Sequence, residues 1–143
     1  MPLPTPEPGV VICYEFLWSH EAAQGAIEGE KRRPAVIVIA TKTEDGATKV
    51  IVAPITRLRK ENSGRAIKIP PKVKAHLGLD NERSWIILDE LNEFIWPGYY
   101  LYPVLGAPPG TYEYGFIPPA LFTQIKGRIL TLDTALKWAP SRD

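Results

Sequence analysis

The residues Pro34-Ala35-Val36-Ile37-Val38-Ile39-Ala40 form the most apolar run of the chain, and most of them are β-branched. Such a run predicts a buried strand. The next segment, Thr43–Ala47, contains Asp45-Gly46, a dipeptide that favours hairpin turns. A second apolar segment, Lys49–Ile55, follows, so we expect the chain to return antiparallel to the first strand. A two-stranded hairpin is therefore expected within a mainly β fold.

Segments on both sides of this hairpin have the composition of further strands and helices. Strands are predicted at Val10–Trp18, Ala66–Ile69, Ser84–Leu91 and Phe94–Trp96. A short helix is predicted at Lys72–Leu77, between two prolines and Gly78. A C-terminal helix is predicted after Pro118-Pro119, because apolar residues recur there at helical spacing. Those residues are Leu121, Ile125, Ile129, Leu132 and Leu136.

The arrangement of these segments predicts one small domain. The chain has 143 residues, with 11 glycines and 15 prolines, which favours many turns and few long helices. Residues 1–8 carry proline at every second position and are expected to form a loose arm. Residues 9–143 are expected to form a single domain, a strongly twisted antiparallel sheet or barrel with a short helix and a C-terminal helix. Pro97–Gly115 is expected to be irregular surface, and Ser19–Arg33 a long loop.

Composition excludes several classes of protein. The net charge is +1, from 17 basic and 16 acidic residues, so any anion-binding surface must be a local patch. A single cysteine, Cys13, excludes an internal disulfide and a multi-cysteine metal site. The N-terminus lacks the pattern of a signal peptide, and no apolar run is long enough to cross a membrane. We expect a soluble cytoplasmic protein that contacts no membrane and needs neither a metal nor an organic cofactor.

Basic residues are concentrated in one part of the chain. Seven of the 17 lie between Arg57 and Lys74, and Lys31-Arg32-Arg33 forms a second cluster. Such a run is compatible with a solvated surface and with a phosphate-binding surface. The candidate RNA contacts among these residues are Arg32, Arg57, Arg59, Lys60, Arg65 and Lys72.

Five residues are candidates for chemistry because of where they stand. Arg33 precedes the apolar strand and Thr56 follows its partner strand, so the sheet would hold both in fixed geometry, either for structure or for phosphate binding. Asp89 stands in an apolar strand, where it would pair with an arginine or accept a proton. His20 could titrate near neutral pH or pack beside Trp18, and Glu21 follows it. Cys13, Trp18 and Phe94 fit core packing, although the two aromatic side chains could also stack on unpaired bases.

Taken together, these segments resemble the MazF/PemK family of toxin ribonucleases. The resemblance rests on the order of five short motifs, each weak when taken alone. They are Gly9-Val10-Val11-Ile12-Cys13-Tyr14, Ser19-His20-Glu21, Arg32-Arg33-Pro34-Ala35-Val36, Val52-Ala53-Pro54-Ile55-Thr56 and Trp85-Ile86-Ile87-Leu88-Asp89-Glu90-Leu91.

The resemblance implies an SH3-like barrel of the kind shared by the MazF and CcdB toxins. It further implies a homodimer, metal-independent cleavage of single-stranded RNA, and a cognate antitoxin that occupies the RNA groove. Arg33 would face the scissile phosphate, and Thr56 would contact phosphate or ribose. His20 and Glu21 would lie beside the scissile bond, and an acid at the position of Asp89 is the base in some members.

Two departures from the family pattern support an alternative. Ile87 stands where members that use the acid place an arginine, and Glu90 replaces the usual glutamine. The alternative is a non-catalytic member of this fold that binds a protein target, as the gyrase-poisoning relatives do.

Overall fold

The computed structural model describes residues 5–17, 32–56, 66–79, 83–97, 101–131 and 137–138. The strands are β1 (Val10–Glu15), β2 (Arg32–Lys42), β3 (Thr48–Thr56), β4 (Ala66–Lys68), β5 (Trp85–Ile87), β6 (Glu90–Ile95), β7 (Glu113–Phe116) and β8 (Lys137–Trp138). The helices are α2 (Pro71–His76) and α3 (Pro119–Thr131). The prediction of a mainly β fold with a short helix and a C-terminal helix is confirmed. No helix among these residues is long and apolar enough to span a bilayer.

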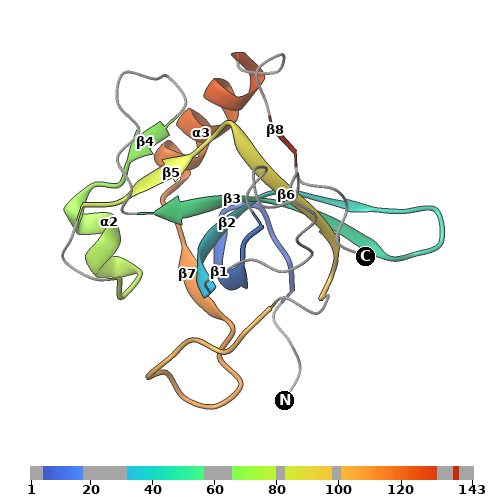
Figure 1. The fold of residues 1–143 in the computed structure, drawn as a ribbon, viewed down its shortest axis with the longest axis horizontal. Helices are drawn as coiled ribbons and strands as arrows, with labels where there is room; N and C mark the ends of the chain where they lie inside the picture. The colour runs from blue at the N-terminus through green and yellow to red at the C-terminus, as the bar shows by residue number, and fades with distance from the viewer. Residues whose placement is uncertain are drawn as a thin grey trace.

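The predicted hairpin is present as β2 and β3, and it lies at the centre of the sheet (Figure 1). The two strands pair antiparallel from Ala35–Pro54 to Lys42–Thr48. The strand order is β4-β5-β3-β2-β1-β7, with β6 paired to β3 and β8. The sheet curls into an antiparallel half-barrel (Figure 1). One pair departs from this pattern, because the short β8 runs parallel to β6.

The two faces of the curled sheet bury separate apolar clusters. One cluster joins Val36, Ala53 and Ile86 to the inward side of α3 through Leu121 and Ile125. The other lies on the opposite face and is rich in aromatic residues. In it, Tyr14 stacks on Phe94 with ring centroids 4.9 Å apart. β1, β3 and the middle of β2 are therefore buried on both faces, which explains why their sequences read as continuous apolar runs.

The chain between residues 84 and 95 differs from the prediction of one strand at Ser84–Leu91 and another at Phe94–Trp96. It forms β5 and β6, separated by a bend at Leu88 and Asp89. The register explains the bend. Ile55 pairs with Ile86 and Val52 pairs with Asn92. The chain therefore advances by three residues on β3 but by six residues from β5 to β6. The three additional residues cannot pair with β3 and form the bend. Asp89 lies at this bend rather than in the middle of a strand.

Two further expectations were partly wrong. The segment Pro97–Gly115, expected to be irregular, ends in β7, which pairs antiparallel with β1. Arg32 and Arg33, expected at the end of a loop, are the first two residues of β2. The predicted cap of α2 is present, since Gly78 has φ +70 and follows the C-cap residue Leu77.

Candidate functional site

Arg33 is held at the start of β2 by the neighbouring strand. It pairs with Tyr14 of β1, and its Nε atom is shielded from solvent. Side chains alternate between the two faces of a strand, so Arg33 shares a face with Ala35, which packs in the aromatic cluster. The base of the side chain is thus fixed by a packed part of the sheet.

Thr56 is the last residue of β3 and is only 7% exposed. It pairs with Trp85 of β5. The last paired residues of β2 and β3 are Ala35 and Pro54. Arg33 lies two residues before Ala35, and Thr56 lies two residues after Pro54. Both residues therefore lie at the same end of the hairpin and, by alternation, on the same face. The fold thus places at one end of the hairpin the two residues that the sequence singled out separately.

Arg32 points to the opposite face from Arg33. It pairs with Glu15 of β1, and its guanidinium carbon lies 3.8 Å from the ring centroid of Tyr102. The Tyr102 hydroxyl in turn donates to Oε2 of Glu15 over 3.1 Å. A cation, an aromatic ring and a carboxylate from three segments are thus joined in one cluster.

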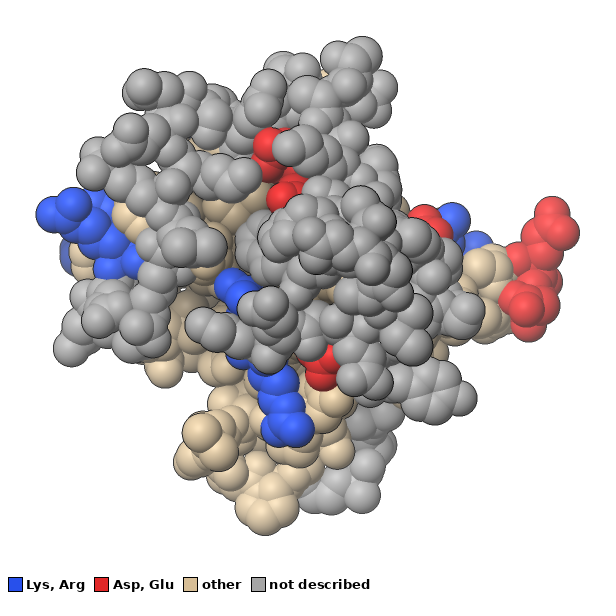
Figure 2. Space-filling model, in the orientation of Figure 1, with Lys and Arg blue, Asp and Glu red and all other residues tan. Residues whose placement is uncertain are grey.

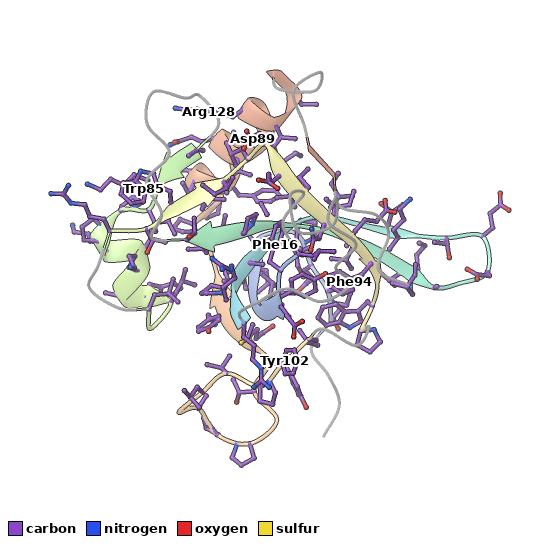
Figure 3. All side chains as sticks on the ribbon, in the orientation of Figure 1. Phe16, Trp85, Asp89, Phe94, Tyr102 and Arg128 are labelled. Atoms are coloured by element: carbon purple, nitrogen blue, oxygen red, sulfur yellow. The ribbon has the colours of Figure 1, made fainter. Side chains whose placement is uncertain are left out.

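Asp89 belongs to a different segment from the strand end that carries Thr56. It is 1% exposed and stands at the bend between β5 and β6, in the part of Figure 3 where α3 and Arg128 lie. Trp85, the partner of Thr56, is four residues earlier in the chain, a path of up to about 13 Å in extended backbone.

The basic residues that the structure describes have different surroundings. Lys72 is exposed on α2. Lys74, two residues later, is 5% exposed, and its Nζ donates to Oγ of Ser84 over 2.8 Å. Lys74 is therefore part of the packing between α2 and the start of β5. Figure 2 shows basic atoms at the side of the molecule where α2 lies, and a second band near the centre of the visible face, above the loop that precedes β7.

Six of the predicted site residues lie outside the described part of the chain. They are His20, Glu21, Arg57, Arg59, Lys60 and Arg65. The structure therefore bears on Arg32, Arg33, Thr56, Lys72 and Asp89.

Three features near the site were missed by the sequence prediction. Tyr102 was assigned to irregular surface, although its backbone N–H donates to the carbonyl of Cys13 over 2.9 Å. Asn92, which is fully buried, bonds to the backbone of Leu17. Burial raises the pKa of the Cys13 thiol, and the pKa of its neighbour Tyr114 is raised by burial and by Cys13 itself. Polar residues at strand positions are the signal that could have found Asn92.

Comparisons with known proteins identify the family. The chain matches the model of the PemK-like, MazF-like toxin of type II toxin-antitoxin systems over residues 15–94, which is more than half of its length. No curated protein shows a significant match. The matched range contains Arg33, Thr56 and Asp89, whereas Tyr102 lies beyond it. The chain belongs to the PemK-like, MazF-like family of toxins of type II toxin-antitoxin systems.

Proposed function

We propose that this toxin is a metal-independent endoribonuclease that cleaves single-stranded RNA by attack of the ribose 2′-hydroxyl on the adjacent phosphate. The observation that carries the proposal is the placement of Arg33 and Thr56 at one end of the β2–β3 hairpin and on one face. The family, which includes mRNA interferases, supports the same reaction class.

The reaction requires charge stabilisation at a crowded, pentacoordinate phosphorus. The Arg33 guanidinium is always protonated and can donate two parallel hydrogen bonds to phosphate oxygens. The Thr56 hydroxyl can donate a third. Because the packed sheet holds both backbones, the donors need little reorganisation when negative charge develops.

Two proton transfers complete the reaction, one from the attacking 2′-hydroxyl and one to the departing 5′-oxygen. The candidates are His20, Glu21 and Asp89. Asp89 lies at the β5–β6 bend and is 1% exposed, and Ile87, where some members place an arginine, is fully buried. Because Asp89 is so little exposed, we propose His20 or Glu21 ahead of it for the proton transfers.

The partners follow from the same proposal. Single-stranded RNA is the substrate, with Arg32, Arg57, Arg59, Lys60, Arg65 and Lys72 as contacts. We further propose a two-fold homodimer that builds the RNA groove between its subunits, and a cognate antitoxin that blocks this groove. Because an exposed lysine contacts phosphate as a flexible point charge, Lys72 would contribute to affinity and little to the rate of cleavage.

Incubation with unstructured RNA tests this function. Cleavage should persist in excess EDTA and should leave a 2′,3′-cyclic phosphate on the upstream product. An RNA with 2′-O-methyl groups throughout should remain intact, because it lacks the nucleophile. Failure to cleave a randomised RNA pool would support the alternative of a non-catalytic module that binds a protein target.

A further inference from the structure

The Arg32–Tyr102 pair is the feature that the proposed reaction does not use. Building on the proposed ribonuclease function, we infer that Arg32 and Tyr102 form a subsite on which one unpaired base of the RNA stacks. The subsite lies on the face of β2 opposite to Arg33, and the inference concerns how the RNA is held rather than how it is cut.

The contact places the Arg32 cation over the ring of Tyr102. The guanidinium carbon of Arg32 is 3.8 Å from the ring centroid of Tyr102, which is van der Waals contact and well inside the range of cation–π attraction. At this distance the guanidinium lies over the ring. Its position is therefore set by an aromatic surface rather than by a flexible ion pair.

Tyr102 is itself fixed by two hydrogen bonds to β1. Its backbone N–H donates to the Cys13 carbonyl over 2.9 Å, and its hydroxyl donates to Glu15 over 3.1 Å. The adjacent residue Leu101 forms a bridge with Tyr14. Both ends of the tyrosine are thus held by the strand that also pairs with Arg32.

This arrangement leaves Arg32 accessible. The residue is exposed, whereas Arg33 is partly buried. Arginine planes and aromatic rings are the surfaces on which unpaired bases stack. Because one face of the guanidinium rests on Tyr102, its outward face is the surface available to a base, and the positive charge adds cation–π attraction.

The alternation of β2 relates this subsite to the proposed cleavage site. Arg32 and Arg33 are consecutive, so their side chains leave the strand on opposite faces. A nucleotide chain that crosses the start of β2 can place a phosphate at Arg33 and turn a neighbouring base towards Arg32. Stacking is sequence-tolerant, since every base has a π-face, so the subsite would add affinity for single-stranded RNA of any sequence.

Substitution of Arg32 by lysine separates stacking from charge. The probe is a randomised, fully 2′-O-methylated oligonucleotide of about 12 nucleotides, which binds without being cut. We expect Arg32→Lys to weaken binding of the oligonucleotide about 10-fold, almost as much as Arg32→Ala. Lysine keeps the positive charge but lacks the planar guanidinium on which a base can stack. Arg128→Lys, at an exposed arginine on α3, should bind as the parent does.

Tyr102 provides the second arm of the test. Tyr102→Phe keeps the ring and should bind within about 3-fold of the parent, whereas Tyr102→Leu should match Arg32→Lys. A probe that contains 2-aminopurine should lose fluorescence on binding the parent and retain more of it with Arg32→Lys. Should Tyr102→Leu fail to fold, the arginine variants alone decide.

The outcomes distinguish this inference from the function on which it rests. Arg32→Lys binding as tightly as the parent, with Arg32→Ala weaker, would show a simple phosphate contact and overturn the stacking subsite. That result would leave RNA cleavage untouched. A parent protein that neither binds the probe nor cleaves RNA would instead refute the proposed function itself.

Discussion

Asn92 and Leu17, 75 residues apart in sequence, are joined by two hydrogen bonds between one side chain and one backbone residue. The Leu17 N–H donates to Oδ1 of Asn92 over 2.9 Å, and Nδ2 of Asn92 donates to the Leu17 carbonyl over 2.7 Å. The asparagine is fully buried. Its amide thus replaces the strand partner that this backbone residue would otherwise need.

Removal of this amide should destabilise the fold. Asn92→Ala leaves a buried N–H and a buried carbonyl without their partner, so we expect a loss of about 2–4 kcal/mol in the free energy of unfolding. Asn92→Asp keeps the acceptor, but its carboxylate would face the Leu17 carbonyl. Burial should raise the folded-state pKa of the new acid above its unfolded value, so this variant should gain stability relative to the parent as pH falls.

Urea unfolding at several pH values measures both effects. The stability of Asn92→Asp should be closest to that of the parent at low pH, where the protonated carboxyl can donate a hydrogen bond to the Leu17 carbonyl. Equal midpoints for the parent and Asn92→Ala would show that the two hydrogen bonds contribute nothing to stability.

Arg33 and Thr56 should act on the rate of cleavage more than on RNA binding. Because Arg33 is proposed to stabilise developing charge from a fixed position, Arg33→Ala should lower single-turnover cleavage at saturating RNA by about 10²–10³-fold. Thr56→Ala removes a neutral hydrogen bond and should lose about 10-fold. Circular dichroism must confirm that each variant is folded, since Arg33 also lies within the first residues of β2. A folded Arg33→Ala protein that cleaves at the parent rate would refute this assignment.

Lys72 and Lys60 should show the opposite behaviour. Lys72 is exposed on α2, and Lys60 is one of the candidate RNA contacts predicted from the sequence. Lys72→Ala or Lys60→Ala should weaken RNA binding and reduce the slope of log affinity against log salt by about one unit each. Saturated cleavage should be almost unchanged. An unchanged salt slope would remove that lysine from the set of phosphate contacts.

Cys13 should resist alkylation in the folded protein. The residue is 6% exposed, and burial raises the pKa of its thiol, although a hydrogen bond with Tyr114 opposes this. We expect iodoacetamide to react with folded protein on the order of 10²-fold more slowly than with protein in guanidinium chloride. The rate should keep rising above the pH at which an ordinary thiol has ionised. Mass spectrometry reports the single adduct, and equal rates in the two conditions would contradict the prediction.

The proposed dimer predicts a sedimentation mass of two chains at micromolar concentration. Ile95 and Trp96 are half-buried, and Leu130 on α3 is 76% exposed, so β6 with its following residues or α3 is the expected contact. Leu130→Glu should shift the mass towards one chain if α3 forms the interface. A parent protein that sediments as a single chain would rule out the dimer.

The central hairpin could be predicted because its signals are local. An apolar run, a turn dipeptide and a second apolar run lie within residues 34–55. The bend at Leu88–Asp89 could not, because it arises when β3 exchanges one partner strand for another. The run from Trp85 to Leu91 contains no glycine or proline to mark the break. The pairing of β7 with β1 was missed for a similar reason, since about 100 residues separate these strands.

The candidate site was likewise predictable only where its residues carried a local signal in the sequence. Arg33 and Thr56 border apolar strands, and that position singled them out before the register placed them at one end of the hairpin. Tyr102 carried no such signal, because its contacts with Arg32 and Glu15 form only when distant segments meet. Contacts of this kind depend on tertiary packing and leave no periodic trace in the sequence.

The turn of the β2–β3 hairpin is a suitable position for attaching a label. Gly46 adopts φ +87 with open space around it, and Glu44 is exposed. Eight steps of β3 separate Thr48 from Thr56, about 26 Å at the rise of a strand. A fluorophore or an affinity tag attached at residue 44 would therefore be far from the proposed catalytic end. Since the chain's single cysteine is buried, Glu44→Cys would label selectively and give a reporter for single-molecule observation of RNA capture.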